Sequence, residues 1–200
     1  MLHLCGLSVR RCSSAAALAL AIMLGSVSAL AGEEAGDERR MQAQSLFNEG
    51  LKVADSDPKG ALGAFRASYE ISPDFRVLYN IGTIYFRLKD PLNAARSYEQ
   101  YLREGGEKVP PKRRKDVEAV MKTLVKSIGT VTIKSSIKDG EVKVDGAVVG
   151  RLPLGHPIHV QPGSRKITIA GGDAPLERTV RVPAGASLAV ELEPKPQERG

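Results

Sequence analysis

Two neighbouring segments between Arg76 and Leu102 carry apolar residues at helical spacing. The apolar positions of the first segment share one helix face and are Leu78, Ile81, Gly82, Tyr85 and Leu88. Asp90-Pro91 then predicts a helix start, because Asp caps free backbone N–H groups and proline is tolerated in the first turn. The apolar face of the second helix is Leu92, Ala95, Tyr98, Tyr101 and Leu102. This pattern predicts an αα-hairpin, which needs neighbours to bury both of its faces.

The same pattern occurs once more upstream, over residues 43–74. The residues that recur, at an offset of 32 or 33 positions, are Gly50 with Gly82, Ala61 with Ala94, and Phe65 with Tyr98. The two segments resemble the tetratricopeptide repeat (TPR), whose first helices match Asn48-Glu49-Gly50 and Asn80-Ile81-Gly82. The alternative is a helical bundle of another kind. An amphipathic helix over 117–128 follows and is expected to cap the array with one polar face.

From Gly129 onward the apolar period changes from helical spacing to two. Six or seven short alternating segments follow, with turn signals at Asp145-Gly146 and Pro162-Gly163, and they predict a small β-sandwich. This half resembles the PEGA domain of bacterial envelope proteins. The matching residues are Val142, Val144, Asp145, Gly146, Gly150, Pro153, Leu154, Val160, Pro162, Gly163, Ile167 and Ile169. Ile137-Lys138-Asp139-Gly140 stands where that family has its eponymous tetrapeptide.

The predicted fold class is α+β in two domains. We expect α-α superhelical TPR-like hairpins with a capping helix over 41–128, starting near Met41, and an all-β PEGA-like sandwich over 129–192. Gly129 is expected to cap the last helix. Residues 32–40 are expected to form a flexible leader and residues 193–200 a disordered tail.

Residues 1–31 have the order of a signal peptide. Arg10-Arg11 precedes the apolar run 13–27, and Ala29-Leu30-Ala31 is a small-residue cleavage site, so we expect cleavage after Ala31. Cleavage after Ala29 is the alternative, and an uncleaved membrane anchor is another. We therefore expect an exported protein of the periplasm or cell envelope, with membrane contact only if the segment is an uncleaved anchor.

Composition removes several classes of function. Both cysteines, Cys5 and Cys12, lie in the signal segment, so the mature chain has no disulfide and no thiolate ligand. Removal of residues 1–31 takes away two arginines and no acidic residue, so the formal charge falls from +6 to +4. This charge is spread along the chain, which argues against a nucleic-acid partner. The basic run 112–115 is either a solvated turn or a contact for anionic envelope polymers or lipid headgroups.

The sequence offers little catalytic chemistry. His156 and His159 have no Asp, Glu or Cys at ligand spacing, so no metal site is expected. The sequence contains no Gly-x-Ser-x-Gly motif, and Gly171-Gly172-Asp173 lacks the residues of a phosphate loop. We predict no catalytic residue, no cofactor and no enzyme activity. A hydrolase of an unrecognised kind is the least favoured alternative.

The resemblance to tetratricopeptide arrays implies a binding groove lined by the first helix of each repeat. Carried over, the groove residues are Phe47, Asn48, Leu51, Arg76, Tyr79, Asn80, Thr83, Phe86 and Arg87. Phe47 and Leu51 replace two residues of the family's carboxylate clamp, so a free C-terminal carboxylate is not implied. Alternatively, Tyr79 and Phe86 pack against a neighbouring helix.

The predicted function is a non-catalytic envelope protein whose groove binds a protein or peptide partner and whose β domain docks on an envelope component. Cell-wall or other envelope polymers are a further partner class. The alternative is an accessory subunit that structures a secretion, motility or cell-wall machine, with the helical array buried permanently in an oligomer.

Overall fold

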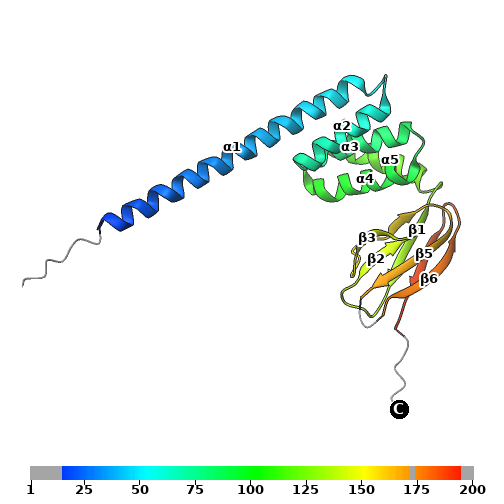
Figure 1. Cartoon of the computed structure of the whole chain (residues 1–200). Coiled ribbons are helices and arrows are strands. Elements are labelled where there is room, and N and C mark those ends of the chain that lie inside the picture. The colour runs from blue at the N-terminus through cyan, green and yellow to red at the C-terminus, as the bar shows by residue number, and fades with distance from the viewer. Residues whose placement is uncertain (1–14, 172–173, 195–200) are drawn as a thin grey trace, which may run out of the picture.

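The computed structural model describes the backbone of residues 15–171 and 174–194, and the side chains of residues 34–171 and 174–194. Helices come first and strands follow, in two separate parts of the molecule (Figure 1). The helices are α1 (Ala15–Val53), α2 (Pro58–Ile71), α3 (Phe75–Arg87), α4 (Pro91–Gly105) and α5 (Pro111–Leu124), with the short 3-10 helix η1 (Gly106–Lys108) before α5. The prediction of an α+β chain in two parts is confirmed.

Each helix packs on the next one in the chain, so α1–α2 and α3–α4 are antiparallel pairs. The helix starts follow the predicted chemistry. Asp57 accepts a hydrogen bond from the backbone N–H of Gly60, and Asp90 accepts one from that of Asn93. A proline occupies the first position of α2, α4 and α5, where a missing N–H group costs nothing.

The two helix pairs approach each other's backbones in the same way. A Cβ atom added at Gly50 would lie 2.7 Å from the ring of Phe65, and one at Gly82 would lie 2.9 Å from the ring of Tyr98. In each pair, therefore, a glycine of the first helix makes room for an aromatic ring of the second. The helical core lies between the pairs and continues to α5 through Val117 and Leu124, which are buried.

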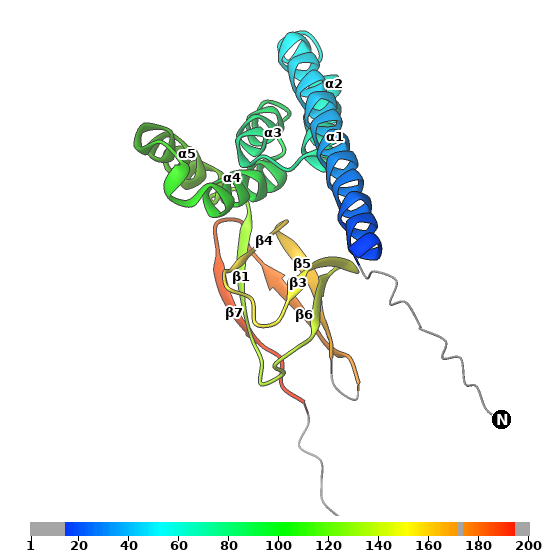
Figure 2. The ribbon, with the colours of Figure 1, turned by 90° about the vertical axis from the view of Figure 1, so that its left-hand side faces the viewer.

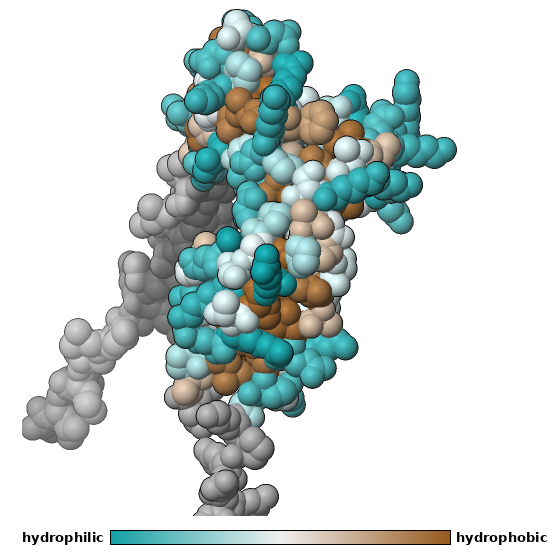
Figure 3. Space-filling model, turned by 90° about the vertical axis from the view of Figure 1, so that its right-hand side faces the viewer, coloured by the Kyte–Doolittle hydropathy of each residue, from teal (hydrophilic) through white to brown (hydrophobic). Residues whose placement is uncertain are grey.

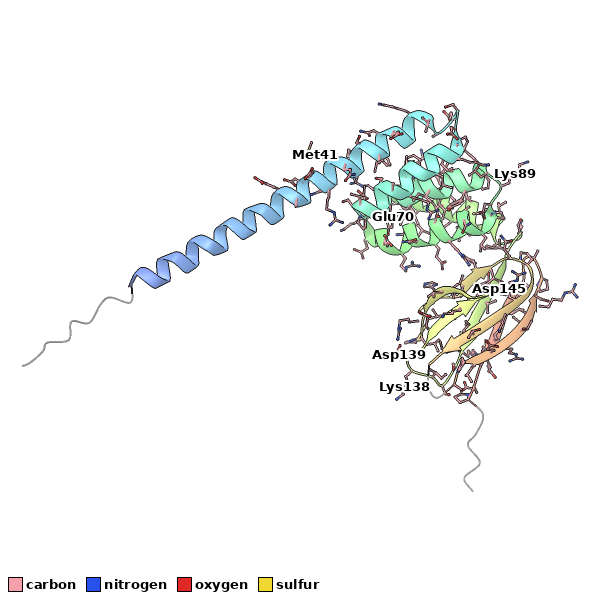
Figure 4. The ribbon with its side chains drawn as sticks, viewed as in Figure 1. Met41, Glu70, Lys89, Lys138, Asp139 and Asp145 are labelled. Carbon is pink, nitrogen blue, oxygen red and sulfur yellow. The ribbon has the colours of Figure 1, made fainter. Side chains whose placement is uncertain are left out.

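The structure of α1 differs from the prediction. The expected flexible leader at 32–40 is helical, and the helix does not start near Met41 but runs unbroken from Ala15 to Val53. No proline interrupts this stretch, and Arg40 pairs with Asp37 one turn earlier at 2.9 Å. Met41 is 74% exposed and lies where α1 leaves the other helices (Figure 4).

The predicted signal peptide stays a prediction, because residues 1–14 and the side chains of 15–33 lie outside what the structure describes. Among the described residues, no helix combines the length and the apolar character needed to cross a membrane. The predicted disordered tail falls largely on residues 195–200, which are also outside the described part.

The β region consists of two small sheets around one core. Its strands are β1 (Gly129–Lys134), β2 (Glu141–Val144), β3 (Ala147–Arg151), β4 (Ile158–Val160), β5 (Gly163–Ala170), β6 (Leu176–Val182) and β7 (Ser187–Glu191). The strand orders are β4-β1-β7 and β3-β2-β5-β6. The predicted Asp145-Gly146 hairpin joins β2 to β3, with φ of 51° and 85° at its two central residues. β1 pairs with β7 in parallel, and all other strand pairs in the described sheets are antiparallel.

The junction between the parts differs from the prediction, because residues 125–128 connect the last helix to the first strand. Gly129 does not cap a helix: α5 already ends at Leu124, and Gly129 is the first residue of β1, paired with Val160. A Cβ atom at Gly129 would lie 2.2 Å from the side chain of Val182, so glycine is required here for close packing. Ile128 is fully buried, and its carbonyl accepts a hydrogen bond from the N–H of Gly185 at 2.8 Å.

Candidate functional site

The first helices of the two pairs, α1 and α3, leave a groove between them. Figure 2 shows α5, α3 and α1 following one another across the helical part, with α4 on the side that faces the sheets. The groove has a volume of about 870 Å³ and lies between α1 and the start of α3. Its lining residues are Arg40, Ala43, Gln44, Phe47, Ser68, Ser72, Pro73, Asp74, Phe75, Arg76, Val77 and Lys108.

The groove brings together two of the nine predicted residues, Phe47 from α1 and Arg76 from α3. The ring of Phe47 packs on Phe65 with centroids 5.5 Å apart, so one side of Phe47 is fixed and the other faces the groove. The hydroxyl of Ser68 donates to the carbonyl of Ala43 at 2.8 Å and ties α2 to α1 beneath it. The wall of the groove is therefore held by core contacts.

The charges at the groove are mostly basic. Asp74 accepts hydrogen bonds from the Nε atom of Arg76 to both of its carboxylate oxygens, at 2.9 Å each. This side-chain hydrogen bond holds the pKa of the Asp74 carboxyl below its usual value, so Asp74 is an anion neutralised by its neighbour. Arg40 pairs with Asp37, whereas Lys108 contributes a cation from η1.

Tyr79 lies outside the groove lining, but it connects α3 to the basic run at the start of α5. Its ring is half-buried and packs on Tyr98 and Tyr101, with centroids 5.9 and 5.7 Å away. The guanidinium of Arg113 lies over this ring, 4.2 Å from its centroid. Tyr79 therefore packs against the neighbouring helix, as its alternative interpretation predicts, and it also contacts Arg113 of α5.

Three further predicted residues hydrogen-bond within or between helices. Thr83 donates to the carbonyl of Tyr79 at 2.9 Å and lies 3.1 Å from the hydroxyl of Tyr98. Asn80 donates to the carbonyl of Arg76 at 3.4 Å, and Asn48 accepts from Gln44 at 3.1 Å. These polar side chains are used locally, on the surfaces of α1 and α3.

The last three predicted residues lie toward the other end of the two helices. Leu51 is 49% exposed and Phe86 is 47% exposed, so neither fills the core. Arg87 donates to the carbonyl of Ala54 at 3.2 Å and pairs with Asp55 at 2.7 Å. Arg87 therefore bridges α3 to the α1–α2 loop.

Sequence reasoning missed several groove residues. Arg40 and Gln44 precede Phe47 by seven and three positions, which places them on the same helix face. Helical spacing places Gln44 on this face within the predicted helix, and it places Arg40 there once the helix is extended through the leader. No sequence signal marks Lys108 or Arg113 as neighbours of α3, because their position depends on how α5 packs.

A second cluster lies where α4 meets β4, around a cavity of about 220 Å³. Arg96 donates to the carbonyl of His159 at 2.8 Å, and the Glu99 carboxylate lies 3.6 Å from His156 and 3.8 Å from His159. Burial is the main cause that lowers the pKa of His159, which Glu99 opposes and Arg96 and His156 reinforce. In the described part of the chain, no group of three His, Cys, Asp or Glu side chains is arranged to hold a metal ion.

No model of a known protein family matches the chain. No curated protein matches it either.

Proposed function

We propose that the helical part is a short tetratricopeptide-type array, and that the chain is a non-catalytic, exported envelope protein whose groove binds a protein or peptide partner. In this proposal the β part is a PEGA-like domain that docks on an envelope component. The equivalent glycine–aromatic contacts at Gly50 with Phe65 and Gly82 with Tyr98 support the repeat interpretation.

The observation that carries the proposal is the groove between α1 and α3. It lies between α1 and the start of α3, and its wall combines an aromatic ring, Phe47, with hydrogen-bonding and charged side chains such as Gln44 and Arg76. Aromatic and arginine side chains are frequent at the energetic centres of protein interfaces. A groove of this mixed chemistry suits an extended peptide segment.

Site-specific photo-crosslinking in envelope fractions tests the proposal. The photoreactive residue p-benzoylphenylalanine would replace Phe47 in one sample and Lys138 in a control. Lys138 is exposed and lies at the end of the β part away from the helices (Figure 4). We expect one protein to be captured from position 47 and not from position 138. Equal capture from both positions, or none from position 47, would contradict the groove assignment.

Exposed apolar residues favour one second candidate, a structural accessory subunit. Leu51, Phe86 and Val148 are each about half exposed or more. On the face shown in Figure 3, hydrophobic residues gather in patches on both parts, surrounded by hydrophilic ones. Light scattering on the purified chain separates the two candidates, because a dissociable binder is expected to be a monomer and a permanently assembled subunit an oligomer.

A further inference from the structure

We propose that the partner segment in the groove is acidic: an extended peptide with several carboxylates that face Lys108, Arg113 and the neighbouring basic residues of α5, and with an apolar side chain against Phe47. This inference rests on the proposed function, because it names the kind of peptide that the same groove would take.

The first argument is the lack of a free carboxylate in the groove. Asp74 is the one acidic residue among the described lining residues, and Arg76 occupies both of its oxygens. Arg40 is likewise matched by Asp37. The pairs contribute little net charge, so the groove's net positive charge comes from Lys108.

The second argument is the run of cations next to Lys108. Residues Lys112, Arg113, Arg114 and Lys115 follow it at the start of α5. Within the described residues, neither Lys108 nor any of these four cations takes part in an ion pair. A helix start disfavours cations, since the backbone N–H groups there already carry partial positive charge. Bound carboxylates would relieve this accumulation of like charge.

The third argument is the position of Arg113. Its guanidinium carbon lies over the ring of Tyr79, 4.2 Å from the ring centroid, so α3 contributes to holding the side chain of Arg113 in place. An arginine held over an aromatic ring can still bind a carboxylate, because its guanidinium carries five N–H donors. Arg114 is fixed differently, because it donates to the carbonyl of Gly106. Arg113 is thus the best-prepared carboxylate-binding residue of the cluster.

The groove also carries apolar surface, which a purely charged polymer would not use. Phe47 and Phe75 are half-buried, and both line the groove. The ring of Phe75 is held against Tyr101 with centroids 5.7 Å apart. A flat lipid surface would meet the exposed basic run but not the groove wall. An acidic peptide that includes an aliphatic or aromatic residue matches both surfaces.

Selection from a random twelve-residue peptide library, displayed on phage, tests this inference on the full chain. We expect the enriched peptides to have a negative net charge and at least one large apolar residue. The best of them is then synthesised, and its binding is measured by fluorescence anisotropy. Changing Lys108→Gln together with Arg113→Gln is expected to weaken binding at least tenfold.

The matched control changes two cations elsewhere, Lys89→Gln together with Lys138→Gln. Lys89 lies at the α3–α4 turn and Lys138 at the far end of the β part, and both are exposed (Figure 4). The control alters the net charge by the same amount, so it is expected to bind like the parent. Equal loss in both double variants would mean that binding follows overall charge, which would overturn the inference.

The remaining outcomes separate the inference from the proposed function. Enriched peptides that are neutral or basic, but lose binding on Phe47→Ala, would overturn the acidic partner and leave the groove function standing. No enrichment, together with no crosslinking from position 47, would overturn both. Binding to vesicles of equal phosphatidylcholine and phosphatidylglycerol that depends on Lys108 and Arg113, without acidic peptides being enriched, would assign the surface to lipid instead.

Discussion

At the scale of single residues, the helix packing depends on Gly82. A Cβ atom here would lie 2.9 Å from the Tyr98 ring, and this ring is fixed by the core and by Thr83. Gly82→Ala is therefore expected to lower the free energy of unfolding by about 1–3 kcal/mol, the usual cost of overpacking. Urea denaturation measures this change.

Gly63 provides the matched control, because it also lies inside a helix and has no atom within 4 Å of an added Cβ. Gly63→Ala is expected to stabilise the chain by about 0.5–1 kcal/mol through helix propensity. If both substitutions shift stability in the same direction, the close contact at Gly82 does not control packing.

Replacement of two aromatic residues near Gly82 by alanine is expected to change stability by very different amounts. Tyr98 is 4% exposed, so Tyr98→Ala leaves a cavity and is expected to cost about 3–5 kcal/mol, by analogy with buried Phe. Phe86 is 47% exposed, and Phe86→Ala is expected to change stability by no more than about 0.5 kcal/mol. Thermal unfolding of the two variants checks this contrast, which would fail if Phe86→Ala unfolded the protein.

At the scale of elements, local chemistry predicted much of the structure. The Asp-Pro helix starts and the Asp145-Gly146 hairpin follow from backbone preferences of neighbouring residues, and they were read correctly. The extent of α1 differs from the prediction, because the charged, glycine-containing residues 32–40 favour a flexible leader but include no proline that would stop a helix. The parallel pairing of β1 with β7 has no local signal, since it joins strands from opposite ends of the β region.

The residues of the candidate site also fall into two groups, those that the sequence could indicate and those that only the packing brings together. The resemblance to tetratricopeptide arrays predicts Phe47 and Arg76 as groove residues, and both line the groove. Lys108 reaches the groove, and Arg113 reaches the ring of Tyr79, only through the packing of η1 and α5. Glu99 is likewise far in sequence from His156 and His159, so ligand spacing could not bring the three together.

The α4–β4 contact makes a pH dependence testable. His159 faces Glu99 and Arg96 from α4, Thr130 from β1, and His156 from the segment just before β4. Its pKa in the folded chain lies below the ordinary value of 6.5, so the unfolded chain takes up the proton first. The stability that neutral His159 contributes is therefore present above about pH 6.5 and decreases as the pH falls below this value.

Unfolding free energies of the parent and of His159→Gln, measured between about pH 8 and pH 5.5, test this. The advantage of the parent over the variant is expected to shrink toward the acidic end. A constant difference across this range would show that His159 does not titrate in the predicted sense.

At the scale of the whole molecule, the short junction is expected to hold the two parts as a unit. Ile128 is fully buried, and its carbonyl accepts a hydrogen bond from Gly185. The N–H of Thr130 donates to the carbonyl of Ala186 at 2.8 Å. Proteases need several exposed, mobile residues, which this stretch does not offer. Limited proteolysis followed by mass spectrometry should therefore show no early cut within 127–131, and an early cut there would mean that the parts are tethered loosely.

The pairing of β1 with β7 also dictates an order of assembly. The helix pairs are built from contacts between neighbours in the chain, so each can form as soon as its own residues have been synthesised. β1, in contrast, lies between β4 and β7, and its parallel partner is the last strand of the fold. Until residues 187–191 have been made, one edge of β1 has no partner and one side of the β core stays open. The first strand of the β part can therefore complete its pairing only after the last strand has been synthesised.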